Sequence, residues 1–189
     1  MMNKLILSLF ILAIIAASCN EPNLPKQHGY PFIKFPEHEY EKWEISGVPY
    51  SFEKPKYTIM VVDTSSAFWY NLNFTLFDAT LYFSYKTFNS NSQFDSLIND
   101  TRNLVYKHTI KATDIPETEI KDSSGNTGIL YEIQGETATS CNFYLSDNKS
   151  KFFRGALYFN NYTTIDSVAP VIDFIKKDIR HIIKTFRFK

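Results

Sequence analysis

The stretch Phe153-Arg154-Gly155-Ala156-Leu157-Tyr158-Phe159 has the pattern that decides the fold. Phe, Gly, Leu and Phe occupy alternate positions, and Arg154, Ala156 and Tyr158 lie between them. Successive side chains of a β-strand point to opposite faces of a sheet, so this period of two predicts a strand with one face in the core and one face outward.

The same alternation continues along much of the chain. Together with 153–159 it predicts about six strands, the others lying at 57–62, 69–75, 79–85, 129–133 and 141–145. The link Ser146-Asp147-Asn148-Lys149 is short enough only for antiparallel neighbours.

Two segments have a helical period instead. Apolar residues recur every three or four positions over 94–108 and 168–186, with Ser92 and Asp95 as the expected N-terminal cap and its partner in the first helix. Strands, a helix, more strands and a closing helix predict an α+β domain, in which two amphipathic helices cover an antiparallel sheet. The element order is similar to that of the PsbP-like sandwich, which is an analogy of fold alone.

The composition argues against two classes of partner. The 189 residues include 20 Lys and Arg and 20 Asp and Glu, so the formal net charge is zero. Binding to nucleic acid or to an anionic membrane by charge needs a surplus of Lys and Arg on one surface.

Seventeen Phe and 12 Tyr residues can fill a core without disulfides or metal ions.

The N-terminus predicts a secretory signal. Lys4 precedes an apolar stretch over 5–17, which at about 13 residues is shorter than the roughly 20 that a membrane-spanning helix needs. The following Ala16-Ala17-Ser18-Cys19 resembles the lipobox of bacterial lipoproteins, in which the Cys is acylated and becomes the first residue of the mature chain.

This resemblance sets the expected domain boundaries. Residues 1–18 are a lipoprotein signal peptide, residues 19–29 are the lipidated Cys19 and a tether, and residues 30–189 are one globular domain. Asn20 follows the Cys in place of the Asp that commonly retains lipoproteins at the inner membrane, which favours the outer membrane.

Few residues suggest catalysis. Cys141 is the only thiol left once Cys19 is acylated, and its strand position beside Phe143 predicts a buried, unreactive side chain. Its candidate base, His108, falls on the apolar stripe of the first helix, where a hydrogen-bonded core residue is expected. We therefore expect no catalytic residue and no enzyme.

Metal and cofactor sites are not expected either. His28 and His38 lie ten residues apart near Glu37 and Glu39, which is the composition of metal ligands without their usual spacing. His181 is expected on the solvated face of the last helix. No glycine-rich loop suited to phosphate is present in the sequence.

The outward phase of the strands gathers the candidate binding residues, which are Arg154, Tyr158, Tyr144 and Tyr82, with Lys86 beside them. Two interpretations remain open. Arg154 either stacks on tyrosines and only covers apolar surface, or belongs to a face that binds a partner, because Arg and aromatic residues are enriched in protein interfaces.

Eight sequence blocks, in order, carry a family resemblance: Gly29-Tyr30-Pro31, Phe35-Pro36-Glu37, Pro49-Tyr50-Ser51-Phe52-Glu53, Trp69-Tyr70-Asn71-Leu72, Leu81-Tyr82-Phe83-Ser84-Tyr85-Lys86, Tyr106-Lys107-His108-Thr109, Phe153-Arg154-Gly155-Ala156-Leu157-Tyr158-Phe159 and Asp166-Ser167-Val168-Ala169-Pro170-Val171. They resemble the GldD family of gliding-motility lipoproteins over residues 29–189, and Cys19 fits as well. Where family members often place a Cys before the Pro-Tyr-Ser-Phe-Glu block, this chain has Val48.

The resemblance implies a membrane-anchored envelope protein of gliding Gram-negative bacteria, required for gliding and for the associated type IX secretion. The family brings no catalytic residue, cofactor or substrate. We expect a non-enzymatic component that contacts other gliding and secretion proteins, anchored in the outer membrane and facing the periplasm. The alternative is an envelope carrier or sensor that holds a small lipid or glycan on the aromatic sheet face; a hydrolase using Cys141 or His108 is least favoured.

Overall fold

The computed structural model describes residues 33–107, 111–122, 124–135, 137, 139–160 and 165–189. The chain divides into two units, residues 1–30 and 31–189, and all described residues belong to the second unit. The expected signal peptide, Cys19, the tether and His28 lie outside the described residues and stay predictions.

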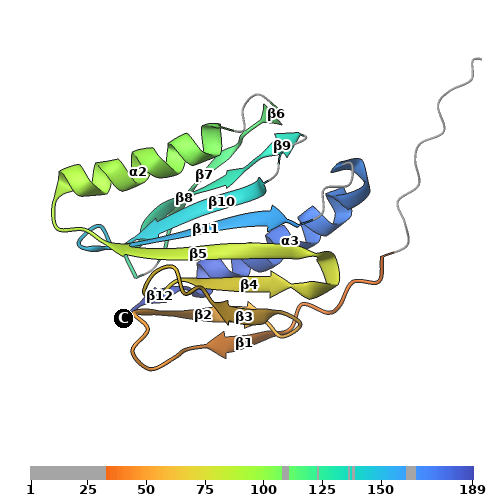
Figure 1. Cartoon of the computed structure of the whole chain (residues 1–189), viewed down its shortest axis with the longest axis horizontal. Helices are drawn as coiled ribbons and strands as arrows, with labels where there is room; N and C mark the ends of the chain where they lie inside the picture. Colours follow the sequence, from red (N-terminus) through yellow and green to blue (C-terminus); the bar gives the residue numbers. More distant parts are fainter. Residues whose placement is uncertain (1–32, 108–110, 123, 136, 138, 161–164) are drawn as a thin grey trace, which may run out of the picture. The chain divides into compact units, whose positions relative to one another are not determined.

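The largest element is an antiparallel sheet of seven strands (Figure 1). In spatial order these are β3 (Ile59–Val62), β4 (Tyr70–Phe74), β5 (Ala79–Thr87), β11 (Lys151–Phe159), β10 (Thr139–Ser146), β8 (Thr127–Glu132) and β7 (Glu117–Lys121). Six of them are the strands that alternation predicts, and β7 is the addition. The predicted α+β fold with an antiparallel sheet is confirmed.

Two smaller sheets were not predicted. β1 (Tyr40–Trp43), β2 (Tyr50–Pro55) and β12 (Arg187–Phe188) form one sheet with β2 in the middle, and β6 (Ala112–Asp114) pairs with β9 (Gln134–Gly135). A 3₁₀ turn, η1 (Thr75–Phe77), links β4 to β5. Five of the six β2 residues are buried, and the alternation of apolar and polar residues, Tyr-Ser-Phe-Glu, spans only four positions.

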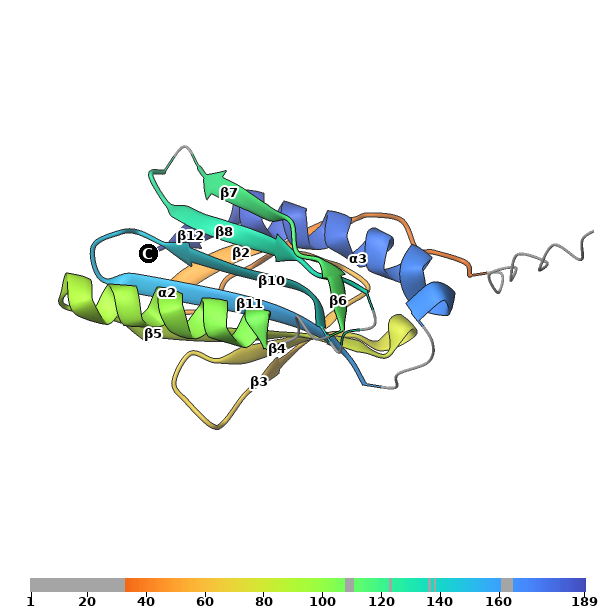
Figure 2. The same cartoon turned by 90° about the horizontal axis from the view of Figure 1, so that it is seen from above.

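The described residues contain two α-helices, α2 (Asn91–Tyr106) and α3 (Ile165–Thr185), which lie on opposite sides of the large sheet (Figure 2). The alternation in β10 explains the arrangement, because Phe143 packs in the core shared with α3 while its neighbour Tyr144 packs in the smaller core under α2. Among the described residues, no helix is long and apolar enough to cross a membrane.

The start of α2 differs from the prediction. The cap is Ser90, whose Oγ accepts a hydrogen bond from the N–H of Gln93 at 3.3 Å, while Gln93 Oε1 accepts one from the N–H of Asn89 at 3.0 Å. Ser90 and Gln93 thus each accept a hydrogen bond from a backbone N–H at the helix start. The observed cap, Ser90, lies two residues before the expected cap, Ser92.

We call the sheet of β1, β2 and β12 the small sheet. Aromatic rings fill the space between the large sheet, the small sheet and α3. Tyr50 and Phe52 of β2, Phe83 of β5, Phe153 of β11 and Phe186 after α3 are each at most 1% exposed. The rings of Phe153 and Phe186 lie 4.5 Å apart, and those of Tyr50 and Phe153 lie 4.7 Å apart. Burying one such side chain stabilises the fold by about 1.5–3 kcal/mol, so this cluster joins the two sheets.

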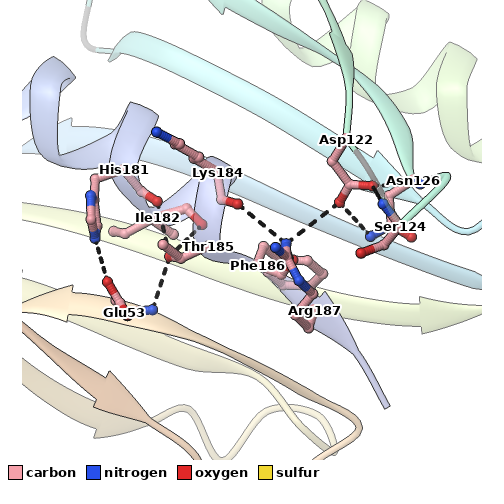
Figure 3. A network of polar contacts seen from close by, with 10 residues as sticks. All are labelled: Glu53, Asp122, Ser124, Asn126, His181, Ile182, Lys184, Thr185, Phe186 and Arg187. Carbon is pink, nitrogen blue, oxygen red and sulfur yellow. Dashed lines mark hydrogen bonds and ion pairs between the residues drawn. The ribbon is translucent and has the colours of Figure 1, made fainter.

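Hydrogen bonds and an ion pair fix the C-terminal end of α3 to two neighbours, β2 and the β7–β8 turn (Figure 3). Thr185 Oγ1 donates to the carbonyl oxygen of His181 at 2.9 Å and accepts from the N–H of Glu53 in β2 at 3.0 Å. Arg187 donates to the carbonyl oxygen of Lys184 at 3.2 Å and forms an ion pair with Asp122 at 3.8 Å, which ties the helix end to the β7–β8 turn.

Candidate functional site

The outward face of the large sheet is only partly covered by α2, and a hollow of about 530 Å³ lies beside the helix. Three of the four predicted binding residues, Arg154, Tyr158 and Tyr82, line it. A second hollow of about 690 Å³ shares Arg154 and Leu104 with the first. We call the two together the sheet–α2 groove; its other lining residues used below are Ser84, Asp100, Asn142, Lys86 and Lys107.

The tyrosines form one wall of the groove. Tyr82 of β5 is 42% exposed, and its ring meets the edge of the Tyr158 ring at a centroid distance of 5.7 Å. Ala156 of β11 pairs with Tyr82 in register and lines the same hollow. The result is an aromatic surface that water reaches.

Arg154 lies in the middle of the sheet, between Ser84 of β5 and Tyr144 of β10 in register. Its side chain is half-buried, and this burial lowers the pKa of its guanidinium, while the nearby Tyr158 and Asp100 act in the opposite direction. No hydrogen bond or ion pair joins Arg154 to another described side chain, and the cation–π contact found among the described residues belongs to Arg102 and Tyr106. Among the described residues, Arg154 therefore makes no cation–π contact with a tyrosine ring.

Tyr144 does not belong to this surface, although its strand phase is outward as predicted. It is 7% exposed and stacks on Phe152 at 5.2 Å in the small core that α2 covers. The sequence pattern gives the face of the strand correctly but cannot say which part of that face a helix covers. We therefore remove Tyr144 from the candidate binding residues.

The sheet edge next to the groove is apolar and exposed. Ile59 is 54% exposed and Val61 is 42% exposed in β3. Val61 pairs in register with Asn71 of β4, which in turn pairs with Tyr82 of β5. The opposite edge strand, β7, carries Glu117, Glu119 and Lys121, and charged side chains protect an edge from pairing. The β3 edge lacks such charges within the strand, which is typical of a surface that meets another protein.

The other sequence candidates are structural where the structure describes them. Cys141 is 1% exposed, as predicted, and burial raises the pKa of its thiol to about 12. His108 lies outside the described residues. Among those described, no three His, Cys, Asp or Glu side chains gather as metal ligands.

His181 is half-buried and paired, which differs from the prediction of a side chain that is simply solvated. Its Nε2–H donates a hydrogen bond to Glu53 Oε2 at 2.7 Å (Figure 3). Its ring stacks on the Tyr40 ring, with the two ring centroids 3.5 Å apart. The small sheet, which the sequence pattern did not predict, supplies both partners.

The sequence analysis missed a buried carboxylate, Asp178 of α3, which is fully buried. It accepts hydrogen bonds from His38 Nδ1 at 2.7 Å, from the Tyr40 hydroxyl at 2.8 Å and from the Tyr57 hydroxyl. Burial first and Asp178 second raise the pKa of both tyrosines. The sequence pattern could have revealed this buried carboxylate, because Asp178 lies between Ile175 and Ile182 on the apolar stripe of α3.

The fold and the groove define an α+β domain with an open, aromatic and cationic surface on one sheet face. The chain belongs to the family of the gliding motility lipoprotein GldD, whose model matches residues 20–188. It is therefore a lipoprotein of gliding motility, and membership of this family implies a membrane-anchored protein of the cell envelope.

Two other comparisons accompany this assignment. The structure is similar to the solution structure of cyanobacterial PsbP (CyanoP) from Synechocystis sp. PCC 6803, with 8% sequence identity and a TM-score of 0.47 over 84% of this chain and 98% of that chain. The comparison with curated proteins gave no match.

Proposed function

We propose that this lipoprotein serves gliding motility, and the type IX secretion associated with it, by binding other envelope proteins without catalysing a reaction. Acyl chains on Cys19 anchor it in the outer membrane, and the domain faces the periplasm. The contact surface is the sheet–α2 groove together with the β3 edge.

The observation that carries the proposal is a row of paired residues that runs from exposed Val61 in β3, through half-buried Asn71, to exposed Tyr82 in β5 and on to β11. Val61, Tyr82 and Tyr158 present apolar and aromatic groups along it, and Arg154 adds an unpaired cation among the described side chains. Aromatic residues and Arg contribute most of the binding free energy in protein interfaces. Exposed apolar surface of this kind is costly in water and is typical of a site that a partner covers.

The size of the first hollow favours a second candidate function. A volume of about 530 Å³ falls in the range of small-molecule sites, roughly 300–1,000 Å³. A carrier or sensor would hold one small lipid or glycan there. Native mass spectrometry of the purified lipoprotein separates the two functions, since a carrier retains a bound small molecule and a contact protein does not.

The test of the proposed function is the double variant Arg154→Ala with Tyr158→Ala in gliding cells. We expect gliding and secretion to fail while the amount, acylation and thermal unfolding of the protein stay near normal. Arg154→Lys should restore only part of the activity, because an ammonium group lacks the planar set of donors of a guanidinium.

Lys177→Ala is the matched control. Lys177 is exposed on α3, on the other side of the large sheet from the groove. Lys176 and Arg180 are less suitable, because both form ion pairs with Glu132. Normal gliding of the double variant, or loss of gliding in Lys177→Ala, would contradict the proposed surface, and unfolding of the double variant would make Arg154 a structural residue.

A further inference from the structure

The groove holds a cation that lacks a partner of its own among the described residues. Arg154 comes from the middle of β11, where the sheet holds its backbone rigidly, and its side chain is half-buried. A guanidinium that has lost part of its hydration without gaining a carboxylate is unfavourable in the free protein. Such a group is prepared to bind an anion, because part of its desolvation has already taken place.

The charges around Arg154 point the same way. The second hollow also contains Lys86 of β5 and, just after α2, Lys107, both exposed, while Asp100 of α2 is the one acidic residue among its lining side chains. Three cations therefore face one carboxylate in this part of the groove. Asp100 and, in the first hollow, Asp63 reduce the positive potential of the three cations without cancelling it, so a negatively charged ligand is favoured.

The donors suit a carboxylate better than a phosphate. Phosphate sites usually rely on several backbone N–H groups of a loop or a helix start. Arg154 lies within a strand that pairs on both sides, with β5 and β10, so the ladder uses the backbone groups around it. What remains is one planar guanidinium, whose fork of donors matches the two oxygens of a carboxylate.

The shape and walls of the groove favour an extended peptide. The two hollows meet at Arg154, so a ligand that binds its guanidinium can continue in both directions. Tyr82 and Tyr158 on one side and Leu104 on the other offer apolar contact next to the charge. A peptide with Asp or Glu beside aromatic or aliphatic residues satisfies both requirements at once.

We infer that the sheet–α2 groove is a receptor for an acidic peptide segment of a partner protein, and that Arg154 binds one of its carboxylates. This inference rests on the proposed function, because it gives the chemistry of the partner at the same surface. Tyr82 and Tyr158 contact the residues that flank the carboxylate. Lys86 and Lys107 attract the segment and add little to its lifetime once it is bound.

The experiment uses the full lipoprotein in detergent micelles and two model peptides, acetyl-Phe-Asp-Phe-Asp-amide and its matched analogue acetyl-Phe-Asn-Phe-Asn-amide. Nuclear magnetic resonance follows the Nε–H signal of Arg154 during each titration. We expect the Asp peptide to shift this signal and to bind at least about tenfold more tightly than the Asn peptide. Arg154→Gln should remove the difference between the peptides, and Lys177→Ala should leave it unchanged.

Three results would overturn the inference. The first is equal affinity of the two peptides for the unmodified protein, and the second is a difference between them that persists in Arg154→Gln. The third is a shift of the Arg154 signal by inorganic phosphate or by oleate when the Asp peptide causes none. If Arg154→Gln fails to fold, Arg154→Lys replaces it, and the difference between the peptides should then shrink without vanishing.

Failure of the inference is distinct from failure of the proposed function. If the Arg154→Ala and Tyr158→Ala double variant stops gliding but the two peptides bind equally, the proposed contact surface is correct, and the inference that it binds a carboxylate is wrong. If the Asp peptide binds as expected but the double variant glides normally, the groove binds acidic peptides and gliding does not depend on it.

Discussion

Replacing Asp178 by Asn keeps the shape of the side chain and removes its negative charge. The carboxylate is fully buried and accepts from His38, Tyr40 and Tyr57. Asn has one acceptor oxygen and a donor group, so at least one of the three donors must lose its partner. The substitution therefore tests whether this carboxylate holds the segment around His38 and Tyr40 onto α3.

The expected loss can be worked out from these contacts. A hydrogen bond to a charged group contributes about 1.5–3 kcal/mol, and a buried donor left without an acceptor costs about 1–3 kcal/mol more. Because the Asn oxygen retains part of the network, we expect about 3 kcal/mol for Asp178→Asn. At about 2–4 °C per kcal/mol for a chain of this size, the Tm falls by about 6–12 °C.

The assay is thermal and urea unfolding of Asp178→Asn beside Asp173→Asn. Asp173 is exposed on the same helix, so its variant should stay within about 0.5 kcal/mol of the unmodified protein. Tyr40→Phe should cost about 1.5–3 kcal/mol alone and much less in the Asp178→Asn background, since the two residues share one network. An Asp178→Asn variant as stable as Asp173→Asn would refute the reasoning.

Four further predictions follow from other parts of the structure. Cys141→Ala should cost about 1–2 kcal/mol and leave gliding intact, and the thiol should resist a thiol reagent until the protein unfolds, because burial raises its pKa to about 12. Gly155→Ala should cost about 2 kcal/mol in urea unfolding, because its Cβ would lie 2.3 Å from the buried Phe143 ring. Since burial and Asp178 raise the pKa of Tyr57 above the ordinary 10.0, its contribution to stability is complete below pH 10 and should be lost as the pH rises further, which alkaline unfolding measures. Cys19→Ser should abolish labelling by a palmitate analogue, and equal labelling of both forms would contradict the lipidation of Cys19.

The strands that could be predicted are those whose sequences alternate over a longer stretch, including β10, which is buried on both faces. Residues 153–159 alternate because α3 and the core cover one face while the groove leaves the other partly open. β2 was not predicted, because its alternation of apolar and polar residues, Tyr-Ser-Phe-Glu, spans only four positions before Lys54 and Pro55 end it. β7 is too polar to stand out, since four of its five residues are exposed.

The candidate site was predictable in part for a related reason. The alternation within each strand places Arg154, Tyr158 and Tyr82 on one face of the sheet. The pairing of β5 with β11 then brings these side chains next to one another. Tyr144 has the same phase, but it lies under α2, and a helix position depends on tertiary packing that no local pattern encodes. The contacts of Asp178 and His181 depend on the small sheet, whose strands come from both ends of the domain.

The central claim is that the sheet–α2 groove meets an envelope protein, and photo-crosslinking at Tyr82 in intact gliding cells tests it most directly. A photoreactive phenylalanine analogue replaces Tyr82, which is 42% exposed at the groove, and the same analogue replaces Lys177 on the far side of the sheet as the control. The account predicts a discrete protein adduct from position 82 that weakens when Arg154 is changed to Ala, and no such adduct from position 177. An adduct from position 177 alone, or only a lipid or glycan adduct from position 82, would contradict it.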